Sequence, residues 1–567
     1  MCGKVLCNQP TIHDPNLKVE MIYQGDVKYG PDNVSPVSSM TILGPHDILL
    51  LNKNDGTVHR ILNNTLLKNP LLDVNVANKR ERGLLGIDTS KDSNGKIYVY
   101  LYYTESEKSD GSDVCPTKRY SNEYHCMPDN EPIGNRLYKY ELKNNKLVNP
   151  KLLLDLPAAP APSHNGGVVT IGPDNNLYVT IGDLLGGTNT NSSTRAQNLD
   201  ERNPDGRGGI LRITQDGKPV GEGILGKSMP LQLYYAYGIR NSFGIDFDPI
   251  AGNLWDTENG PEYGDEINLV KPGFNSGWER IQGTHVRSNG KLENFDGRGK
   301  YSSPEFIWEV SSGVTAAKFL DSDKLGKKYE NDLFVASFNS RTIYHFDLNK
   351  DRTGLSLKGS ISDKIANNST NLDDIIFVQE IGMITDIDIG PDGFMYVLSA
   401  YMGKPTIFRI VPIQNLGPLK AIMNLPTDRI DLIDKNHIWK PSKQAEITQS
   451  ADNLTIRVNT SEKKVSNNRG FLVTELNLRK PLLLSLNYKI GTNLGNATYR
   501  IEIRDSNSSK VLFKSGLENI PGNAIEKKFI LPPAITPGEL LEFRVYVVTK
   551  GGGYHAIVIN KFDILQT

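Results

Sequence analysis

Short runs of alternating apolar and polar residues recur along about the first 400 positions, and turns rich in Gly, Pro, Asp and Asn separate them. Alternation with a period of two is typical of half-buried β-strands, and these turn residues favour hairpins. The clearest unit, GGVVTIGPDNNLYVTIGD, runs from Gly166 to Asp183, and MITDIDIGPDGFMYVLSA begins at Met383. A further strand follows each unit, beginning at Gly208 and Thr406 respectively. The pattern predicts small antiparallel sheets built from one repeated strand–turn–strand phrase.

Related phrases occur at four more places, which gives six units over about 400 residues. They begin at Ser39, Gly83, Ser242 and Val314. No clear amphipathic helix interrupts them. Repetition of a small sheet at this interval predicts a six-bladed β-propeller, in which circular closure protects the strand edges. An all-β sandwich is the alternative for this region, but it does not explain the sixfold return of the phrase.

The repeated phrase ends near Pro412, and the residues after it follow a different sequence pattern. Residues 414–443 are Pro-rich and irregular, which is typical of a linker. Residues 444–567 contain alternating runs such as LTIRVNT and LLEFRVYVVT, which predict a β-sandwich of the jelly-roll or immunoglobulin type. We therefore expect an all-β chain: an N-terminal extension (1–16), a propeller (17–413), a linker and an accessory sandwich. The sandwich is expected to have a structural or docking role, and contact with a glycan stays open.

Composition narrows the class of protein. The chain has 567 residues, of which 38% are hydrophobic, and 64 Lys+Arg balance 65 Asp+Glu. There is no basic surplus to bind nucleic acid. No apolar run approaches the ~20 residues of a transmembrane helix, and the first ten residues carry no apolar segment of a secretory signal. We expect a trimmed, extracytoplasmic protein, with a cytosolic protein as the alternative.

Two cysteines support the extracytoplasmic expectation. Cys115 and Cys126 flank a polar, turn-rich segment, VCPTKRYSNEYHC, which a disulfide would close. Two free thiols in a surface loop are the alternative. A zinc site is less favoured, because no CxxC spacing occurs and only His125 lies nearby.

A histidine stands in a glycine-rich phrase directly before one of the predicted strands. The phrase is Ser163-His164-Asn165-Gly166-Gly167. Histidine is the side chain best suited to accept a hydroxyl proton near neutral pH, and paired glycines let the backbone pass close to a ligand. His164 is therefore a candidate general base. The alternative is a loop histidine that hydrogen-bonds a neighbouring carbonyl.

Two further polar phrases can bind a ligand or an ion. Arg240 and Asn241 adjoin in YGIRNS, and a guanidinium is suited to carboxylate or quinone oxygens. Their alternative roles are an internal salt bridge and a turn. The acidic segment ENGPEYGDE, from Glu258 to Glu266, offers carbonyl and carboxylate oxygens that suit Ca²⁺. Its alternative is an exposed acidic turn.

Together these phrases resemble the soluble quinoprotein glucose dehydrogenase family, also called the glucose/sorbosone or aldose sugar dehydrogenases. The resemblance extends from about Leu17 to Ile413. It rests on an ordered set of phrases, namely ERGLLGID at Glu81, GNRLYKYEL at Gly134, SHNGGVVTIGPDNNLYVTIGD at Ser163 and the long segment from Tyr235 to Trp278. The family fold is a six-bladed propeller, in agreement with the repeat count.

The resemblance implies an activity and a set of roles. Family members bind pyrroloquinoline quinone (PQQ) together with Ca²⁺ in the central depression and oxidise the C1 hydroxyl of an aldose to a lactone. The general base of the family matches His164. The polar pair on the cofactor matches Arg240 and Asn241, and the carbonyls that hold calcium match Gly260 and Pro261.

Three more positions match polar groups near the family's cofactor or substrate. The resemblance implies that Asn259 contacts the cofactor and that Glu81 and Asp183 contact the substrate. The partners implied are a sugar or polyol and an electron acceptor that the sequence does not identify.

The chain departs from the family where the cofactor's three carboxylates would be bound. Asn339 stands near the position of a family lysine, and Met383 and Thr385 replace an Arg-x-Arg. At about 1.5–3 kcal/mol for each hydrogen bond to a charged group, these losses could weaken binding by several kcal/mol. We expect Arg341 to substitute in part as a cofactor ligand.

Two principal functions therefore compete. One is a calcium- and PQQ-dependent sugar dehydrogenase with an altered carboxylate site. The other is a non-catalytic secreted propeller that binds glycans or a protein partner. Oxidation of another polyol or alcohol with a different cofactor pose is a third. The joint presence of His164, Arg240, Asn241 and the Gly-Pro loop favours the enzyme.

Overall fold

The structure of the protein is a computed structural model with two compact units, residues 1–414 and 415–567. In the first unit it describes residues 10–25, 35–107, 118–120, 123–125, 133–159, 161–184, 198, 204–287, 290–367 and 369–413. In the second it describes residues 428–431, 438–441, 445–449, 454–460, 466–475, 484–494, 497–506, 511–515, 518–519, 525–530, 540–549 and 553–566. Cys115 and Cys126 lie outside these residues.

The described residues are mostly β-strand, which confirms the all-β prediction. Their helices are short 3-10 turns, namely η2 (Leu231–Leu233), η3 (Gly359–Ile361) and η4 (Ser369–Ile375). None of these helices has the length and apolar character required to traverse a bilayer.

The strands of the first unit form six sheets of four or more strands. The first three sheets are β3 (Val37–Gly44), β4 (Asp47–Asn52), β5 (Thr57–Leu62), β6 (Thr65–Leu66) and β7 (Leu72–Asp73); β8 (Leu84–Lys91), β9 (Ile97–Glu105), β12 (Gly134–Lys143) and β13 (Lys146–Leu156); and β14 (Val169–Ile171), β15 (Asn176–Ile181), β16 (Gly209–Thr214), β17 (Tyr234–Tyr237), β21 (Phe274–Asn275) and β24 (Lys300–Tyr301).

The other three are β18 (Ser242–Phe247), β19 (Leu254–Glu258), β20 (Asp265–Val270), β25 (Phe306–Trp308) and β29 (Ile365–Ala366); β26 (Val314–Phe319), β27 (Leu333–Ser337), β28 (Thr342–Phe346), β30 (Ile376–Gln379) and β1 (Thr11–Ile12); and β31 (Met383–Ile389), β32 (Met395–Tyr401), β33 (Lys404–Pro412) and β2 (Leu17–Gln24). Two ribbons join β10 (Lys118–Tyr120) to β11 (Glu123–His125) and β22 (Ile281–Gln282) to β23 (His285–Val286).

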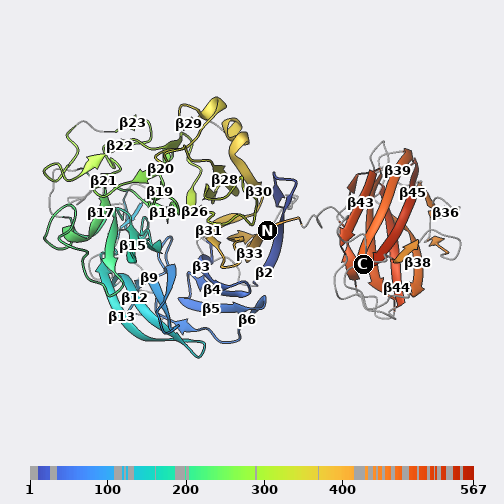
Figure 1. Cartoon of the computed structure of the whole chain (residues 1–567), viewed down its shortest axis with the longest axis horizontal. Coiled ribbons are helices and arrows are strands. Elements are labelled where there is room, and N and C mark those ends of the chain that lie inside the picture. The colour runs from blue at the N-terminus through green and yellow to red at the C-terminus, as the bar shows by residue number, and fades with distance from the viewer. Residues whose placement is uncertain are drawn as a thin grey trace. The chain divides into compact units, whose positions relative to one another are not determined.

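The six sheets follow one another in a closed circle. Strand β3 contacts β8, β8 contacts β14, β15 contacts β18, β18 contacts β26, β26 contacts β31, and β31 contacts β3 again. Figure 1 shows β3, β15, β18, β26 and β31 near the middle of the unit, with β13, β6, β23 and β29 at its periphery. Residues 11–12, which we expected to belong to an extension, form β1 and pair with β30, and β2 pairs with β33. The N-terminal strands thus join sheets formed by the end of the unit.

Aspartates of the repeated phrase connect neighbouring sheets. Each lies on an inner strand and accepts a hydrogen bond from the backbone of the adjacent sheet. The pairs are Ile171 N–H to Asp88 at 2.8 Å, Phe319 N–H to Asp246 at 2.8 Å, Met40 N–H to Asp386 at 2.9 Å and Ile42 N–H to Asp388 at 3.2 Å. A carboxylate is a strong acceptor for a buried N–H. The aspartates of these inner strands therefore connect neighbouring sheets, whereas the apolar residues beside them form the core.

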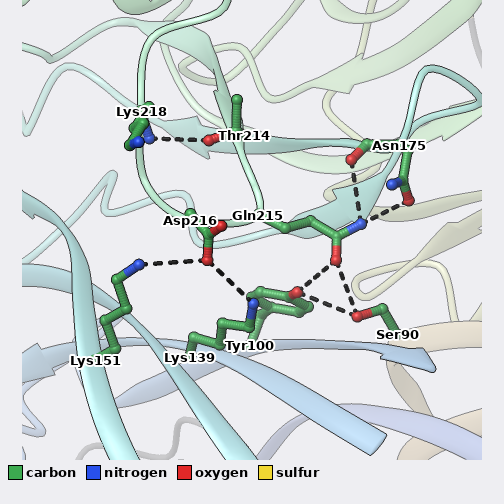
Figure 2. Close-up of polar contacts among 9 residues, drawn as sticks. All are labelled: Ser90, Tyr100, Lys139, Lys151, Asn175, Thr214, Gln215, Asp216 and Lys218. Carbon is green, nitrogen blue, oxygen red and sulfur yellow. Dashed lines mark hydrogen bonds and ion pairs between the residues drawn. The ribbon is translucent and has the colours of Figure 1, made fainter. Parts of the chain in front are cut away.

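A second polar contact between sheets lies farther from the centre, at the turn after β16 (Figure 2). The Gln215 amide nitrogen donates to the Asn175 side chain at 2.6 Å, and its oxygen accepts from the Tyr100 hydroxyl at 2.7 Å and from Ser90 at 3.0 Å. Asp216 lies between Lys139 and Lys151 at 3.4 and 3.3 Å. The turn of one sheet is thereby bound to the strands of its neighbour.

The second unit consists of two sheets of antiparallel strands. One contains β34 (Asp428–Asp431), β36 (Ala445–Gln449), β37 (Leu454–Thr460), β39 (Leu484–Leu494), β43 (Ile525–Ile530) and β45 (Gly553–Gln566); the other contains β35 (Lys440–Pro441), β38 (Ser466–Glu475), β40 (Ala497–Asp505), β41 (Val511–Lys514), β42 (Glu518–Asn519) and β44 (Leu540–Thr549). Alternate residues of β40 and β44 are fully buried, as the period-two pattern requires; they are Tyr499, Ile501, Ile503, Leu541, Phe543, Val545 and Val547.

Candidate functional site

A cavity of about 360 Å³ opens where the inner strands of the six sheets meet. Residues of β3, β8, β14, β18, β26 and β31 line it, together with the loops that adjoin these strands. Of the predicted site residues, Glu81 and Asn259 line the cavity directly. Gly166 and Gly167 of the histidine phrase line it as well.

His164 lies beside this cavity in a constrained loop. Its φ angle is 63°, a left-handed conformation that costs a residue with a Cβ atom about 1–3 kcal/mol. The glycines that follow are required by space, since a Cβ on Gly166 would lie 2.6 Å from the Thr180 carbonyl oxygen. The His164 backbone N–H donates to Glu81 Oε2 at 2.6 Å. The glycines and this hydrogen bond together hold the histidine at the edge of the cavity.

Asp183 contacts the imidazole of His164. Its Oδ1 lies 2.5 Å from His164 Nδ1, and its side chain is only 1% exposed. Its Oδ2 accepts the indole N–H of Trp278 at 2.8 Å. We predicted a substrate contact for Asp183; the structure places its side chain 1% exposed, with one carboxylate oxygen on His164 and the other on Trp278. Nε2 is the ring nitrogen that Asp183 leaves available.

The Arg240–Asn241 pair joins this group through Glu81 and Asn259. Asn241 donates to Glu81 Oε2 at 3.2 Å, and Arg240 Nη1 donates to the Asn259 carbonyl oxygen at 2.8 Å. Burial lowers the pKa of the Arg240 guanidinium, although Asp183 and Glu81 oppose this shift. A guanidinium in this environment stays charged. The Asn259 backbone N–H also donates to the Asn241 carbonyl at 2.9 Å, so that, with His164 and Asp183, six predicted site residues are within one hydrogen-bonded group.

The predicted calcium loop is close to the same group. The Gly260 backbone N–H donates to Asp265 Oδ1 at 2.9 Å, and Asp265 also accepts from the N–H groups of Ser312 and Gly313 at 2.7 Å. Within the part of the chain that the structure describes, no donor reaches the carbonyl oxygens of Gly260 and Pro261. Both carbonyls are therefore available to a cation.

A set of buried acids lies behind this loop. Asp256, Glu258 and Glu266 are each at most 1% exposed. Burial raises the pKa of Asp256 and that of Glu266 to about 7. Burial, Glu266 and Asp256 together raise the pKa of Glu258 well above its usual value. Glu258 Oε1 accepts the Arg240 backbone N–H at 2.7 Å, so this buried carboxyl group supports the arginine loop.

Two of the three residues that we expected in place of the family's cations are in the cavity wall. Asn339 and Thr385 line the cavity, and the Thr385 hydroxyl is buried without a partner among the described residues. Arg341 was predicted to substitute for the missing charge. It is exposed in the turn between β27 and β28, with a φ angle of 56°, and does not belong to the cavity wall. The structure therefore does not bring Arg341 to the other predicted residues.

Sequence reasoning missed the cations that do line the cavity, Lys53 and Lys318. Lys53 donates to the carbonyl oxygens of Arg80 and Arg82 at 2.8 Å. Lys318 lies 3.2 Å from Asp388, and Asp246, Asp388, Asp88 and Asp386 overcome the effect of burial to raise its pKa. Lys318 occupies the position in its repeat that Asp88 and Asp246 occupy in theirs, and this break in the pattern was the available signal.

Gly182 is predicted to be indispensable to this arrangement. A Cβ atom there would lie 2.5 Å from the His164 carbonyl oxygen and 2.6 Å from that of Arg240, so Gly182→Ala must displace one of the two loops. We expect a loss of about 1–3 kcal/mol in the free energy of unfolding, measured by urea denaturation. Gly44→Ala is the control, since its nearest neighbour is 3.7 Å away. Equal stability of the two variants would contradict the expectation.

Comparison with known proteins places these features in a wider group. The model of the family described as "Glucose / Sorbosone dehydrogenase" matches residues 35–405. The chain is 28% identical over 247 residues to aldose sugar dehydrogenase YliI of Escherichia coli K12, which covers 43% of this chain and 59% of that protein. It is 28% identical over 322 residues to quinoprotein glucose dehydrogenase B of Acinetobacter calcoaceticus, which covers 53% of this chain and 59% of that protein. The chain thus spans less than two thirds of both relatives.

Solved structures share the fold. The soluble aldose sugar dehydrogenase of E. coli in its apo form superposes with a TM-score of 0.51 at 21% identity, over 70% of this chain and 99% of that one. A structure described as a glucose dehydrogenase gives a TM-score of 0.51 at 19% identity, over 69% and 98% of the two chains.

Proposed function

The chain belongs to the glucose/sorbosone dehydrogenase family, and on this premise we propose that it is a sugar dehydrogenase that oxidises the C1 hydroxyl of an aldose to a lactone with PQQ and Ca²⁺. The single observation that carries the proposal is the hydrogen-bonded group at the cavity. It joins His164 to Asp183 on one side and to Glu81 on the other. A base, a carboxylate and an arginine are thereby close to one cavity.

We also propose an architecture for the chain, namely a propeller, a linker and an accessory domain. We propose that the six sheets are the blades of a six-bladed β-propeller formed by residues 17–413, with β1 (Thr11–Ile12) of the preceding segment added to one blade. Residues 414–443 would be the linker, and residues 444–567 an accessory β-sandwich, to whose two sheets β34 and β35 of the proposed linker segment add a short strand each. The closed circle of contacts among the inner strands supports the propeller. We also propose an extracytoplasmic location, which the predicted Cys115–Cys126 disulfide would suit.

The residues present fit PQQ at its quinone end. The only described acceptor of the Arg240 guanidinium is the Asn259 carbonyl, so its remaining N–H groups would be left to donate to the quinone oxygens. Arg240, Asn241 and Asn259 would hold the cofactor, and the Gly260 and Pro261 carbonyls would hold the calcium ion. PQQ, when bound, supplies the two-electron acceptor that no side chain provides.

Side chains of the protein would accept and stabilise the proton that leaves the C1 hydroxyl. Asp183 fixes His164 through Nδ1, so Nε2 would accept the proton of the C1 hydroxyl. The imidazolium that forms would be stabilised by the adjacent Asp183 carboxylate. Glu81 uses Oε2 for the His164 backbone and Asn241, and no described residue donates to Oε1. Glu81 Oε1 would thus accept a hydrogen bond from a sugar hydroxyl.

One observation favours the second candidate, a non-catalytic propeller that binds glycans or a protein partner. The cavity wall contains Glu81, Asp88, Asp386 and Asp388 beside only two lysines, and Asn339 and Thr385 carry no charge. Four carboxylates oppose the binding of a cofactor with three carboxylates of its own. Loading would then depend on Ca²⁺ and on protonation of the raised-pKa aspartates.

Reconstitution separates the two candidates. The protein is titrated with PQQ in the presence of Ca²⁺ and followed by absorbance, and dye reduction is then measured with several aldoses. We expect saturable PQQ binding that EDTA reverses, together with aldose-dependent dye reduction. Absence of PQQ binding at every pH between 5 and 8 would exclude the dehydrogenase and leave the binding protein.

A further inference from the structure

The indole of Trp278 completes the hydrogen-bonded group around His164. Trp278 lies between β21 and β22 and is 2% exposed. Its Nε1–H donates to Asp183 Oδ2 at 2.8 Å, while Asp183 Oδ1 contacts His164 Nδ1 at 2.5 Å. One carboxylate is thus shared by an indole and an imidazole that are 114 positions apart in the sequence. The orientation of the carboxylate relative to the imidazole depends on both contacts.

The indole is itself held on several sides. The Trp278 backbone N–H donates to the Gly238 carbonyl at 2.9 Å, and its own carbonyl accepts from Asn198 at 3.0 Å. The guanidinium groups of Arg240 and Arg287 lie 5.4 and 4.4 Å from the ring centroid, within the range of cation–π attraction. Neither contact uses the indole N–H. The position of the ring is therefore fixed independently of the bond to Asp183.

Burial alone does not explain this bond. Trp255 and Trp308 are 0% and 1% exposed, and each has an Nε1 atom without a partner among the described residues. Hence this protein tolerates buried indole N–H groups that are unpaired. Of the three buried indoles in the first unit, only that of Trp278 is directed at the carboxylate that contacts His164.

We propose that Trp278 is a positioning residue whose indole N–H holds the Asp183 carboxylate so that His164 keeps its proton on Nδ1 and leaves Nε2 to accept one. The effect on catalysis rests on the proposed function, whereas the effect on the imidazole is a property of the free protein. Charged groups near the pair are Glu81, Arg240, Glu279 and Arg287, and all of them remain when only the indole N–H is removed.

Trp278→Phe tests this in the full-length protein without cofactor. It removes the N–H donor and retains an aromatic ring beneath the two arginines. With ¹⁵N-labelled histidine, we expect the parent to show His164 with its proton on Nδ1 in a far-downfield resonance. The variant should show a mixture of the two tautomers and faster exchange of that proton. An unchanged His164 spectrum in Trp278→Phe would overturn the proposal.

Trp308→Phe is the matched control, because it removes an equally buried indole whose N–H has no described partner. It should leave the His164 spectrum as in the parent, and the same loss of the Nδ1 proton in this variant would also overturn the proposal. In the reconstituted enzyme, Trp278→Phe should lower kcat about tenfold with KM unchanged, the size expected for one hydrogen bond to a charged group. A parent without activity would remove the proposed function but not the spectroscopic test.

A second variant covers the case in which Trp278→Phe does not fold. Asp183→Asn removes the negative charge that accepts the indole N–H, and the readout is the indole resonance of Trp278. The chain has four tryptophans, and Trp255→Phe, Trp308→Phe and Trp439→Phe assign three of the four signals, which leaves the fourth to Trp278. We expect the Trp278 signal to move upfield and to exchange faster with solvent. A Trp278 signal identical to that of the parent would show that Asp183 is not its acceptor.

Discussion

Replacing His164 with alanine is expected to lower the turnover number about 10²–10⁴-fold in the PQQ- and Ca²⁺-loaded enzyme, the usual contribution of a general base. The imidazole is the group beside the cavity whose Nδ1 is held by a buried carboxylate. The cofactor contacts proposed for Arg240 and Asn259 do not involve it. PQQ affinity should therefore change little, and the loss should be in kcat.

The measurement is dye-linked aldose oxidation at saturating PQQ, with PQQ affinity determined separately by absorbance titration. His13→Ala is the control, since His13 is exposed, contacts Gln379 at 3.3 Å and is not among the residues that line the cavity. It should retain the activity of the parent. Retained turnover in His164→Ala would disprove the assignment of the base.

Replacing Lys318 with methionine should destabilise the protein by about 3–5 kcal/mol at pH 8, the usual cost of leaving buried charge uncompensated. Lys318 lies 3.2 Å from Asp388 and is attracted by Asp88, Asp246 and Asp386 as well. Methionine keeps most of the apolar volume and removes only the charge. The four carboxylates would then face one another across the centre of the ring.

The effect should depend on pH in a defined direction. Burial raises the pKa of Asp88 to about 6 and that of Asp386 to about 7, above the unfolded value of about 3.9. Such groups bind protons more tightly in the folded state, so parent stability should fall as pH rises from about 4 to about 7. Without Lys318 these pKa values rise further, so in the variant the fall should continue above pH 7.

Urea denaturation at pH 5 and pH 8, followed by tryptophan fluorescence, measures this difference. Three of the four tryptophans, Trp255, Trp278 and Trp308, lie in the first unit and report on it. Lys227→Met is the control, because its ion pair with Glu222 is 74% and 79% exposed and should contribute at most about 1 kcal/mol. A Lys318→Met variant as stable as this control at pH 8 would contradict the electrostatic role of Lys318.

The part of the site that could be predicted from the sequence was carried by short phrases. The histidine phrase at His164, the pair at Arg240 and the loop at Gly260 each combine a polar residue with the glycines or proline that shape its backbone. Such local combinations indicate where a loop exposes polar groups. In the structure, His164 and Arg240 lie beside the cavity, where they donate hydrogen bonds to Glu81 and to the Asn259 carbonyl, respectively.

The sequence did not indicate which distant residues the predicted site residues would contact. Asp183 was expected to meet a substrate, yet it contacts His164 and Trp278, and Arg341 was expected at the cavity but lies in an exposed turn. Alternation along a strand predicts the face on which a residue lies. It does not predict which side chains of the neighbouring sheet contact that face. Lys318 and its carboxylates were missed for the same reason.

The sequence by itself determined the strands, their repetition and the loops that carry the polar phrases, because alternation and turn chemistry are properties of consecutive residues. Only the tertiary structure decided which charges meet. Closure of the ring brings Asp88, Asp246, Lys318 and Asp388 from four different sheets to one centre. It likewise joins Trp278 to Asp183. Contacts between sheets depend on distance in space, which no local pattern encodes.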